Sequence, residues 1–124
     1  MHKGFVDWDK VPEEKIVDGV RRKLITTDKM TVVLWMWDKG VDLPMHTHPE
    51  DQFYYLISGK ARFDSDGESR IVDTPGASWM VPGNVPHSTV YLEDSVTMDI
   101  FSPPREDMIA GTDPYIRAAT KRKV

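Results

Sequence analysis

The chain has 124 residues, with 16 Lys and Arg against 20 Asp and Glu and a formal net charge of −4. This length predicts one domain over residues 1–124, and the absence of cysteine excludes disulfides and thiolate metal ligands. Four basic residues fall within the last eight positions, so the rest of the chain is strongly acidic, which disfavours a nucleic-acid partner. The longest apolar run, residues 31–37, is too short to cross a bilayer, so we expect no membrane partner and, by default, a cytoplasmic location.

Short β-rich runs, separated by turn residues every eight to twelve positions, predict an all-β fold. The expected strands cover residues 19–26, 31–37, 52–58, 60–64, 68–72, 77–81, 87–91 and 96–101. Dipeptides such as Asp66-Gly67 and Pro75-Gly76 supply the backbone angles that tight turns need. Eight strands with this punctuation suggest a double-sheet jelly roll with its core at about residues 19–102.

The two ends of the chain are expected to lie outside this core. Residues 1–18 form an N-terminal extension with a short strand, and its apolar Phe5, Val6 and Trp8 are expected to pack on the barrel or on a second subunit. Residues 103–124 hold a helical turn near 105–110, after which we expect order to fade into a solvated basic tail. Exposed strand edges and the apolar extension together favour a homodimer.

Three of the four histidines carry the functional prediction. In a strand, residues two apart point to the same face, so His46 and His48 are expected to project inward from one wall of the barrel. His87 begins a later strand, from which a third imidazole can converge on them. Three neutral imidazoles facing one point would bind one divalent metal ion, such as Ni, Fe, Mn, Zn or Co. The alternative is that they are hydrogen-bonded core histidines.

The spacing around these histidines resembles the two sequence motifs of the cupin superfamily. The first runs Gly40, five residues, His46-Thr47-His48, three residues, Gln52, six residues, Gly59. The second runs Gly76, five residues, Pro82-Gly83-Asn84, two residues, His87. The resemblance implies a double-stranded β-helix, the cupin jelly-roll barrel.

Two positions depart from the usual motifs. Asn84 replaces a glycine, and because Asn tolerates a positive φ, the turn is expected to survive. Gln52 replaces a glutamate, so a neutral carbonyl would leave the metal more positive and less tightly held. Gln52 is alternatively a polar residue of the barrel wall. Glu50 offers a harder donor, but Pro49 is expected to place it on a turn.

The string at residues 98–107, together with residues 18–23 and the first motif, resembles the KdgF-like small cupins associated with pectin degradation. This resemblance implies an enzyme that opens the ring of 4,5-unsaturated uronates to give linear keto sugars. The implied small-molecule substrate is therefore an anionic sugar. Carried over by position, the implied metal ligands are His46, His48, Gln52 and His87. The implied substrate-side residues are Asp99, Phe101 and Arg105.

The side-chain chemistry is compatible with that reaction. Burial near the end of an apolar strand would raise the pKa of Asp99 and suit it to proton transfer. The planar guanidinium of Arg105 would clamp a substrate carboxylate in bidentate fashion. The alternatives are an ion pair between Asp99 and Arg105, and a solvated helical turn at Arg105.

Two other functions remain open at this stage. A three-histidine site also suits a quercetinase-like dioxygenase. Turnover by a dioxygenase would stop without oxygen, whereas turnover by an isomerase would continue. A non-catalytic sugar-binding or sensory cupin would bind tightly without turnover.

Overall fold

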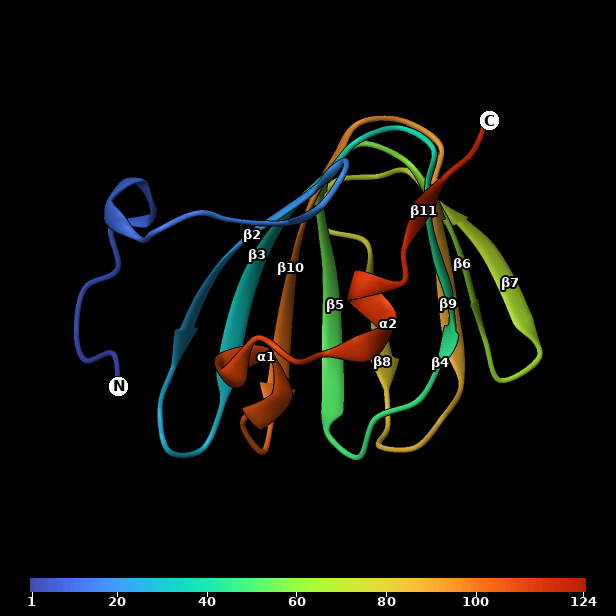
Figure 1. Cartoon of the computed structure of the whole chain (residues 1–124). Helices are drawn as coiled ribbons and strands as arrows, with labels where there is room; N and C mark the ends of the chain where they lie inside the picture. Colours follow the sequence, from blue (N-terminus) through green and yellow to red (C-terminus); the bar gives the residue numbers. More distant parts are fainter.

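The computed structural model describes residues 1–124, which fold into two antiparallel β-sheets that face one another (Figure 1). The six-stranded sheet has the order β1-β2-β3-β10-β5-β8, and the five-stranded sheet has the order β11-β4-β9-β6-β7. In chain order the strands are β1 Glu14–Val17, β2 Val20–Thr26, β3 Thr31–Trp37, β4 Val41–His46, β5 Asp51–Ser58, β6 Ala61–Ser65, β7 Glu68–Val72, β8 Ser78–Val81, β9 His87–Tyr91, β10 Ser95–Ser102 and β11 Thr120–Lys121.

The core lies between the sheets, and strict alternation places its side chains there. In β3, every second residue is buried, so Val33, Trp35 and Trp37 point inward. The Trp37 ring stacks on Trp35 at a centroid distance of 4.7 Å and on Tyr91, from the opposite sheet, at 4.6 Å. The all-β jelly roll predicted from periodicity is therefore confirmed.

The eight predicted strands are all present and β1 is the short strand expected in the N-terminal extension, but the prediction lacked β4 and β11. Residues 41–46 were not predicted as a strand because Pro44 lacks a backbone N–H and the alternation that starts at Val41-Asp42-Leu43 stops at this proline. The ladder between β4 and β9 pairs Leu43 with Thr89 and His46 with His87, so β4 carries one residue more than its partner between these pairs. This β-bulge turns both Leu43 and His46 toward the interior although they are three positions apart.

The C-terminal segment is where the prediction was wrong. The helical turn exists as α1, Glu106–Ala110, but the chain stays ordered through α2, Pro114–Arg117, and β11. The backbone N–H of Arg122 donates to Gly40 O at 2.8 Å, and the Lys121 ammonium lies 3.5 Å from an Asp38 carboxylate oxygen. The basic tail is therefore not a frayed end, because it covers the edge of β4 and places its cations beside acidic groups.

The N-terminal residues run along the β2 side of the six-stranded sheet and include the short helix η1, Trp8–Lys10 (Figure 1). The Lys23 ammonium donates to Trp8 O at 2.7 Å, whereas the Phe5 side chain is 90% exposed. None of the helices in this chain is long and apolar enough to span a membrane.

Candidate metal centre

The three predicted histidines converge, but only two of them lie on strands. His46 ends β4, His87 begins β9 directly opposite, and His48 lies in the loop before β5. The expectation that His46 and His48 project from one strand by alternation is therefore wrong for His48. The bulge in β4 aims His46 inward, and the loop conformation directs His48 toward the same point.

The turn before His87 holds that loop in place. Asn84 adopts the positive φ of 67° expected for its position, and its backbone N–H donates to His48 O at 2.7 Å. The backbone N–H of Gly83 donates to Asp51 Oδ1 at 2.8 Å, and a Cβ at Gly83 would come within 2.2 Å of Pro49 O. Glycine at this position therefore permits the close approach that brings the two motifs together.

Each ring is oriented by a hydrogen bond on its outer side, where Nδ1–H donates to a backbone carbonyl. These bonds run from His46 to Pro44 O at 2.7 Å, from His48 to Glu50 O at 3.0 Å and from His87 to Val85 O at 2.9 Å. In a neutral imidazole this leaves a lone pair on Nε2, the usual arrangement for metal-ligating histidines.

The lone pairs face one another across a short gap. Nε2 of His48 lies 3.2 Å from Nε2 of His87, and one nitrogen from each of the three rings falls within 4.8 Å of the others. With both Nδ1 protons committed to carbonyls, no proton remains to make the 3.2 Å contact a hydrogen bond. Three converging imidazole lone pairs therefore fit a divalent cation better than the core-histidine alternative.

The protonation states suit metal binding. Burial lowers the pKa of His46 to about 3, with a further contribution from His87, and burial lowers the pKa of His87 to about 4. Burial also lowers the pKa of His48, and the neighbouring Arg105 charge adds to this effect. The three rings are consequently neutral at physiological pH, as metal ligands must be.

Gln52 connects the histidine cluster to Asp99. Its Oε1 lies 3.1 Å from Nε2 of His48, and its Nε2 donates to Oδ1 of Asp99 at 2.9 Å. Asp99 is 5% exposed, and burial raises its pKa to about 7, while the Gln52 hydrogen bond acts in the opposite direction. Asp99 forms no ion pair, so the alternative in which it pairs with Arg105 does not hold.

Arg105 is fully buried, which rules out a solvated helical turn. Its Nε and Nη2 each donate to one carboxylate oxygen of Asp107 at 2.9 Å, and Nε lies 3.4 Å from Glu50 Oε1. The bidentate edge of the guanidinium is therefore already occupied, contrary to our expectation that it would clamp substrate. Nη1 alone is buried without a partner, and the guanidinium carbon lies 4.6 Å from the Phe101 ring centroid.

Two further residues complete the surroundings of the cluster. Glu50 lies on the bend before β5, and its Oε1 is 3.7 Å from His48 Nδ1, on the side of the ring away from Nε2. The Phe101 ring packs edge-on against His48 at a centroid distance of 5.5 Å, so it forms part of the buried wall.

Sequence reasoning missed Tyr115, whose ring stacks on His46 at a centroid distance of 3.8 Å and an interplanar angle of 6°. The available signal was Asp113-Pro114, because proline favours the first position of a helix and so predicts the start of α2. That helix carries Tyr115 to the centre.

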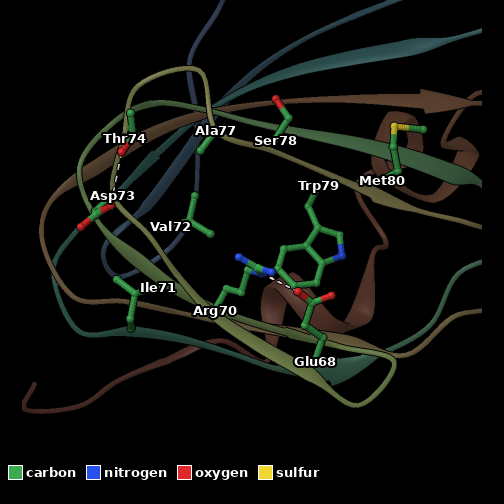
Figure 2. A pocket seen from close by; sticks show the side chains of 10 residues that line it. All are labelled: Glu68, Arg70, Ile71, Val72, Asp73, Thr74, Ala77, Ser78, Trp79 and Met80. Carbon is green, nitrogen blue, oxygen red and sulfur yellow. Dashed lines mark hydrogen bonds and ion pairs between the residues drawn. The ribbon is translucent and has the colours of Figure 1, made fainter.

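A cavity of about 20 Å³ lies inside the barrel beside the cluster, with His46, Gln52, His87, Asp99 and Tyr115 among its lining residues. A separate and larger hollow of about 530 Å³ opens between β7 and β8, where Trp79 and the ion-paired Glu68 and Arg70 line it (Figure 2). None of the residues of the metal centre lines this second hollow, so we assign it no part in the chemistry.

Comparison with known proteins agrees with this geometry. The sequence model of the family described as "Cupin domain" matches residues 33–102. The structure is similar to that of an RmlC-like cupin from Shewanella frigidimarina, with a TM-score of 0.81 and 28% identity over 86% of this chain and 96% of that one. The chain therefore belongs to the cupin family.

Within the family, the similarity extends to a particular kind of small cupin. The chain is 38% identical over 112 residues to the pectin degradation protein KdgF of Dickeya dadantii, which covers 88% of this chain and 100% of that protein. It is also similar to the structure of KdgF from Halomonas sp., with a TM-score of 0.80 and 30% identity over 86% of this chain and 99% of that one. The predicted resemblance to KdgF is thereby confirmed.

Proposed function

We propose that this protein is a metal-dependent enzyme of pectin-type sugar breakdown that opens the ring of an unsaturated uronate to a linear keto sugar. The observation that carries the proposal is that Gln52 connects three converging imidazole lone pairs to a buried carboxyl group. The likeness to KdgF supplies the substrate class.

In this proposal His46, His48 and His87 hold the divalent ion, and Gln52 contributes its Oε1 as a fourth ligand. When bound, the metal supplies Lewis acidity that polarises a substrate oxygen and stabilises the negative charge that develops on ring opening. Three imidazoles and an amide are all neutral, so they leave the full charge of the ion available for that task.

Asp99 is the proposed acid–base residue. Its raised pKa of about 7 means that the carboxyl group both holds and releases a proton near neutral pH, where general catalysis is most efficient. Oδ1 is engaged by the Gln52 amide, so Oδ2 is the atom that exchanges the proton with substrate. Opening the cyclic form of an unsaturated uronate requires such a proton movement.

Arg105 and Phe101 would define the substrate side of the centre. Because Asp107 accepts hydrogen bonds from Nε and Nη2, we assign the hydrogen bonding of the substrate carboxylate to Nη1, which has no partner. Burial by itself would lower the pKa of Arg105, but the Asp107 hydrogen bonds raise it, so the guanidinium stays charged. The Phe101 ring, whose centroid lies 4.6 Å from the guanidinium carbon, helps to position Arg105 through a cation–π contact.

The test is turnover of a 4,5-unsaturated uronate, measured as the loss of its alkene absorbance. Mn, Fe, Co, Ni and Zn are supplied in turn to metal-free protein. We expect acceleration over buffer with at least one metal and equal rates in air and under nitrogen. No acceleration with any metal would discard the substrate assignment, and a rate that requires oxygen would favour a dioxygenase instead.

We also propose that the protein is a homodimer formed through the outer face of the six-stranded sheet. Three strands present mainly apolar side chains there, with the exposed Asp51 and Ser102 at one end, and a fourth strand adds Met80. The apolar residues are Val32, Leu34, Met36, Phe53, Tyr55, Ile57, Met80, Val96, Met98 and Ile100. Met80 is 64% exposed. The charged side chains of this face, Arg21, Lys23 and Asp51, lie at its margins, so the apolar centre can meet its own copy across a two-fold axis, which favours a second copy as the occupant. A monomer by sedimentation would overturn this proposal.

A further inference from the structure

Tyr115 stands between the histidine cluster and the protein surface. Its ring lies parallel to the His46 ring, and it lines both the inner cavity and an outer cleft of about 320 Å³. Tyr115 shares the outer cleft with residues of the β4–β5 loop and of the two C-terminal helices, among them His48, Glu50 and Asp107. The two spaces meet at this side chain.

The sizes of the two spaces show what the ring excludes. A cavity of about 20 Å³ is large enough for roughly one water molecule. Pockets that hold small organic ligands measure about 300 to 1,000 Å³, a range that the outer cleft reaches. A sugar acid therefore fits in the outer cleft but stops at Tyr115 before it reaches Asp99.

We propose that Tyr115 is the gate of the metal centre and that its ring must leave the stack on His46 before substrate can pass from the outer cleft, which His48 lines, to His46, His87 and Asp99. Only the identity of the substrate rests on the proposed function. The barrier itself follows from the position of the ring.

The backbone on either side of Tyr115 is anchored, so the movement falls to the side chain. Asp113, two residues before it, forms a fully buried ion pair with Arg22, and β11 pairs with β4 a few residues after it. Ile116, its neighbour in α2, is 2% exposed and packs in the core. Rotation of one ring displaces none of these contacts.

The closed arrangement leaves polar groups unsatisfied. The Tyr115 hydroxyl and Arg105 Nη1 are both buried without a well-aligned hydrogen bond, and the attraction between this hydroxyl and the guanidinium, whose carbon lies 5.2 Å from the Tyr115 ring centroid, does not satisfy either group fully. Unpaired buried polar groups cost free energy, so a bound anion that accepts from Nη1, together with a hydroxyl released to solvent, would favour the open position.

The experiment measures access to His87 in metal-free protein, so it depends on neither metal nor substrate. Diethyl pyrocarbonate acylates neutral imidazoles, and mass spectrometry of peptides locates the modified ring. His87 is only 2% exposed, and an open state with a population of 0.1 to 10% would limit its labelling. We therefore expect Tyr115→Ala to label His87 between about 10-fold and 1,000-fold faster than the wild type.

Matched variants separate a gate from general loosening. Tyr115→Phe keeps the ring and removes the buried hydroxyl, so it should label no faster than the wild type, and Tyr115→Leu should fall between Phe and Ala. Ile116→Ala removes core packing from the same helix but leaves the ring, so it should also label like the wild type. Equal rates for Tyr115→Ala and wild type would overturn the gate, as would equally fast labelling in Ile116→Ala. If the variants label in the expected order but the protein turns over no uronate, the substrate assignment is overturned and the gate stands.

Discussion

Arg22 and Asp113 lie 91 residues apart in sequence and form an ion pair in which neither side chain is exposed. Arg22 Nη1 and Nη2 donate to the two carboxylate oxygens at 3.0 and 3.2 Å, and Nη2 also donates to Met108 O at 3.3 Å. This contact fastens the C-terminal segment, and with it Tyr115, onto the six-stranded sheet. This buried pair is therefore one of the contacts that hold Tyr115 over the histidine cluster, together with the pairing of β11 with β4.

Removing one partner of this pair should be costly. Asp113→Ala leaves the buried Arg22 charge with only the half-exposed Glu14 carboxylate, 3.4 Å from Nε, as an ion-pair partner. We therefore expect the free energy of unfolding to fall by about 3 kcal/mol in denaturant titrations, the low end of the range for breaking a buried pair. The control is Lys121→Ala, which breaks a solvent-exposed pair with Asp38 and should change stability by less than about 1 kcal/mol. A loss no larger than that of the control would show that the buried pair does not anchor the segment.

His87→Ala should abolish divalent-metal binding while the protein still folds, because the core is built from apolar side chains. In the wild type, metal at about 100 times its dissociation constant should stabilise the fold by about 2.7 kcal/mol, seen as a rise in the unfolding temperature. The variant should show no such rise. His2→Ala, which changes the one histidine outside the cluster, serves as the control. A metal-dependent rise that persists in His87→Ala would contradict the assignment.

The metal-free protein should respond to acid through the buried histidines. The folded pKa values of His46 and His87, about 3 and about 4, lie below the ordinary 6.5, so folding favours the neutral rings. Their stabilising contribution is complete above pH 6.5 and is lost as pH falls toward 4. His87→Ala should therefore lose less stability than wild type between pH 7 and pH 5 in urea titrations with chelator present.

Asp99 acts on stability in the opposite sense. Its folded pKa of about 7 lies above the ordinary 3.8, so its contribution is complete below pH 3.8 and is lost as pH rises through 7. Asp99→Asn removes this opposing effect, and we expect the variant to lose more stability than wild type on acidification from pH 7 to pH 5. Parallel pH profiles for wild type and Asp99→Asn would contradict the raised pKa.

Asp99→Asn should also separate catalysis from metal binding. If Asp99 transfers the proton, kcat should fall by about 10²–10⁴ while the metal content by elemental analysis stays unchanged. Asp64→Asn on β6, away from the centre, should keep full activity. Loss of metal together with activity in Asp99→Asn would instead assign Asp99 the role of holding Gln52 in position.

The strands that could be predicted are those whose pattern is local. β3 alternates buried and half-buried residues along its whole length, and Thr31–Trp37 was found to the residue. β4 was missed because its bulge and Pro44 break the alternation, and β11 because two residues carry no periodic signal. Such elements form only when a partner strand supplies their hydrogen bonds.

For the site, motif spacing identified His46, His48 and His87, and residue preference explained Asn84. Neither could reveal that Asp107 occupies the bidentate edge of Arg105, because this contact depends on the side-chain rotamers of both residues in the folded protein.

The sequence alone determined the all-β class, the cupin motifs and the identity of the converging imidazoles, because periodicity and motif spacing depend only on residues that are close in sequence. Tertiary structure decided which groups are left unpaired, how far the Asp99 pKa moves and that Tyr115 covers His46. These properties arise from burial and from contacts between distant segments, and neither exists until the chain has folded.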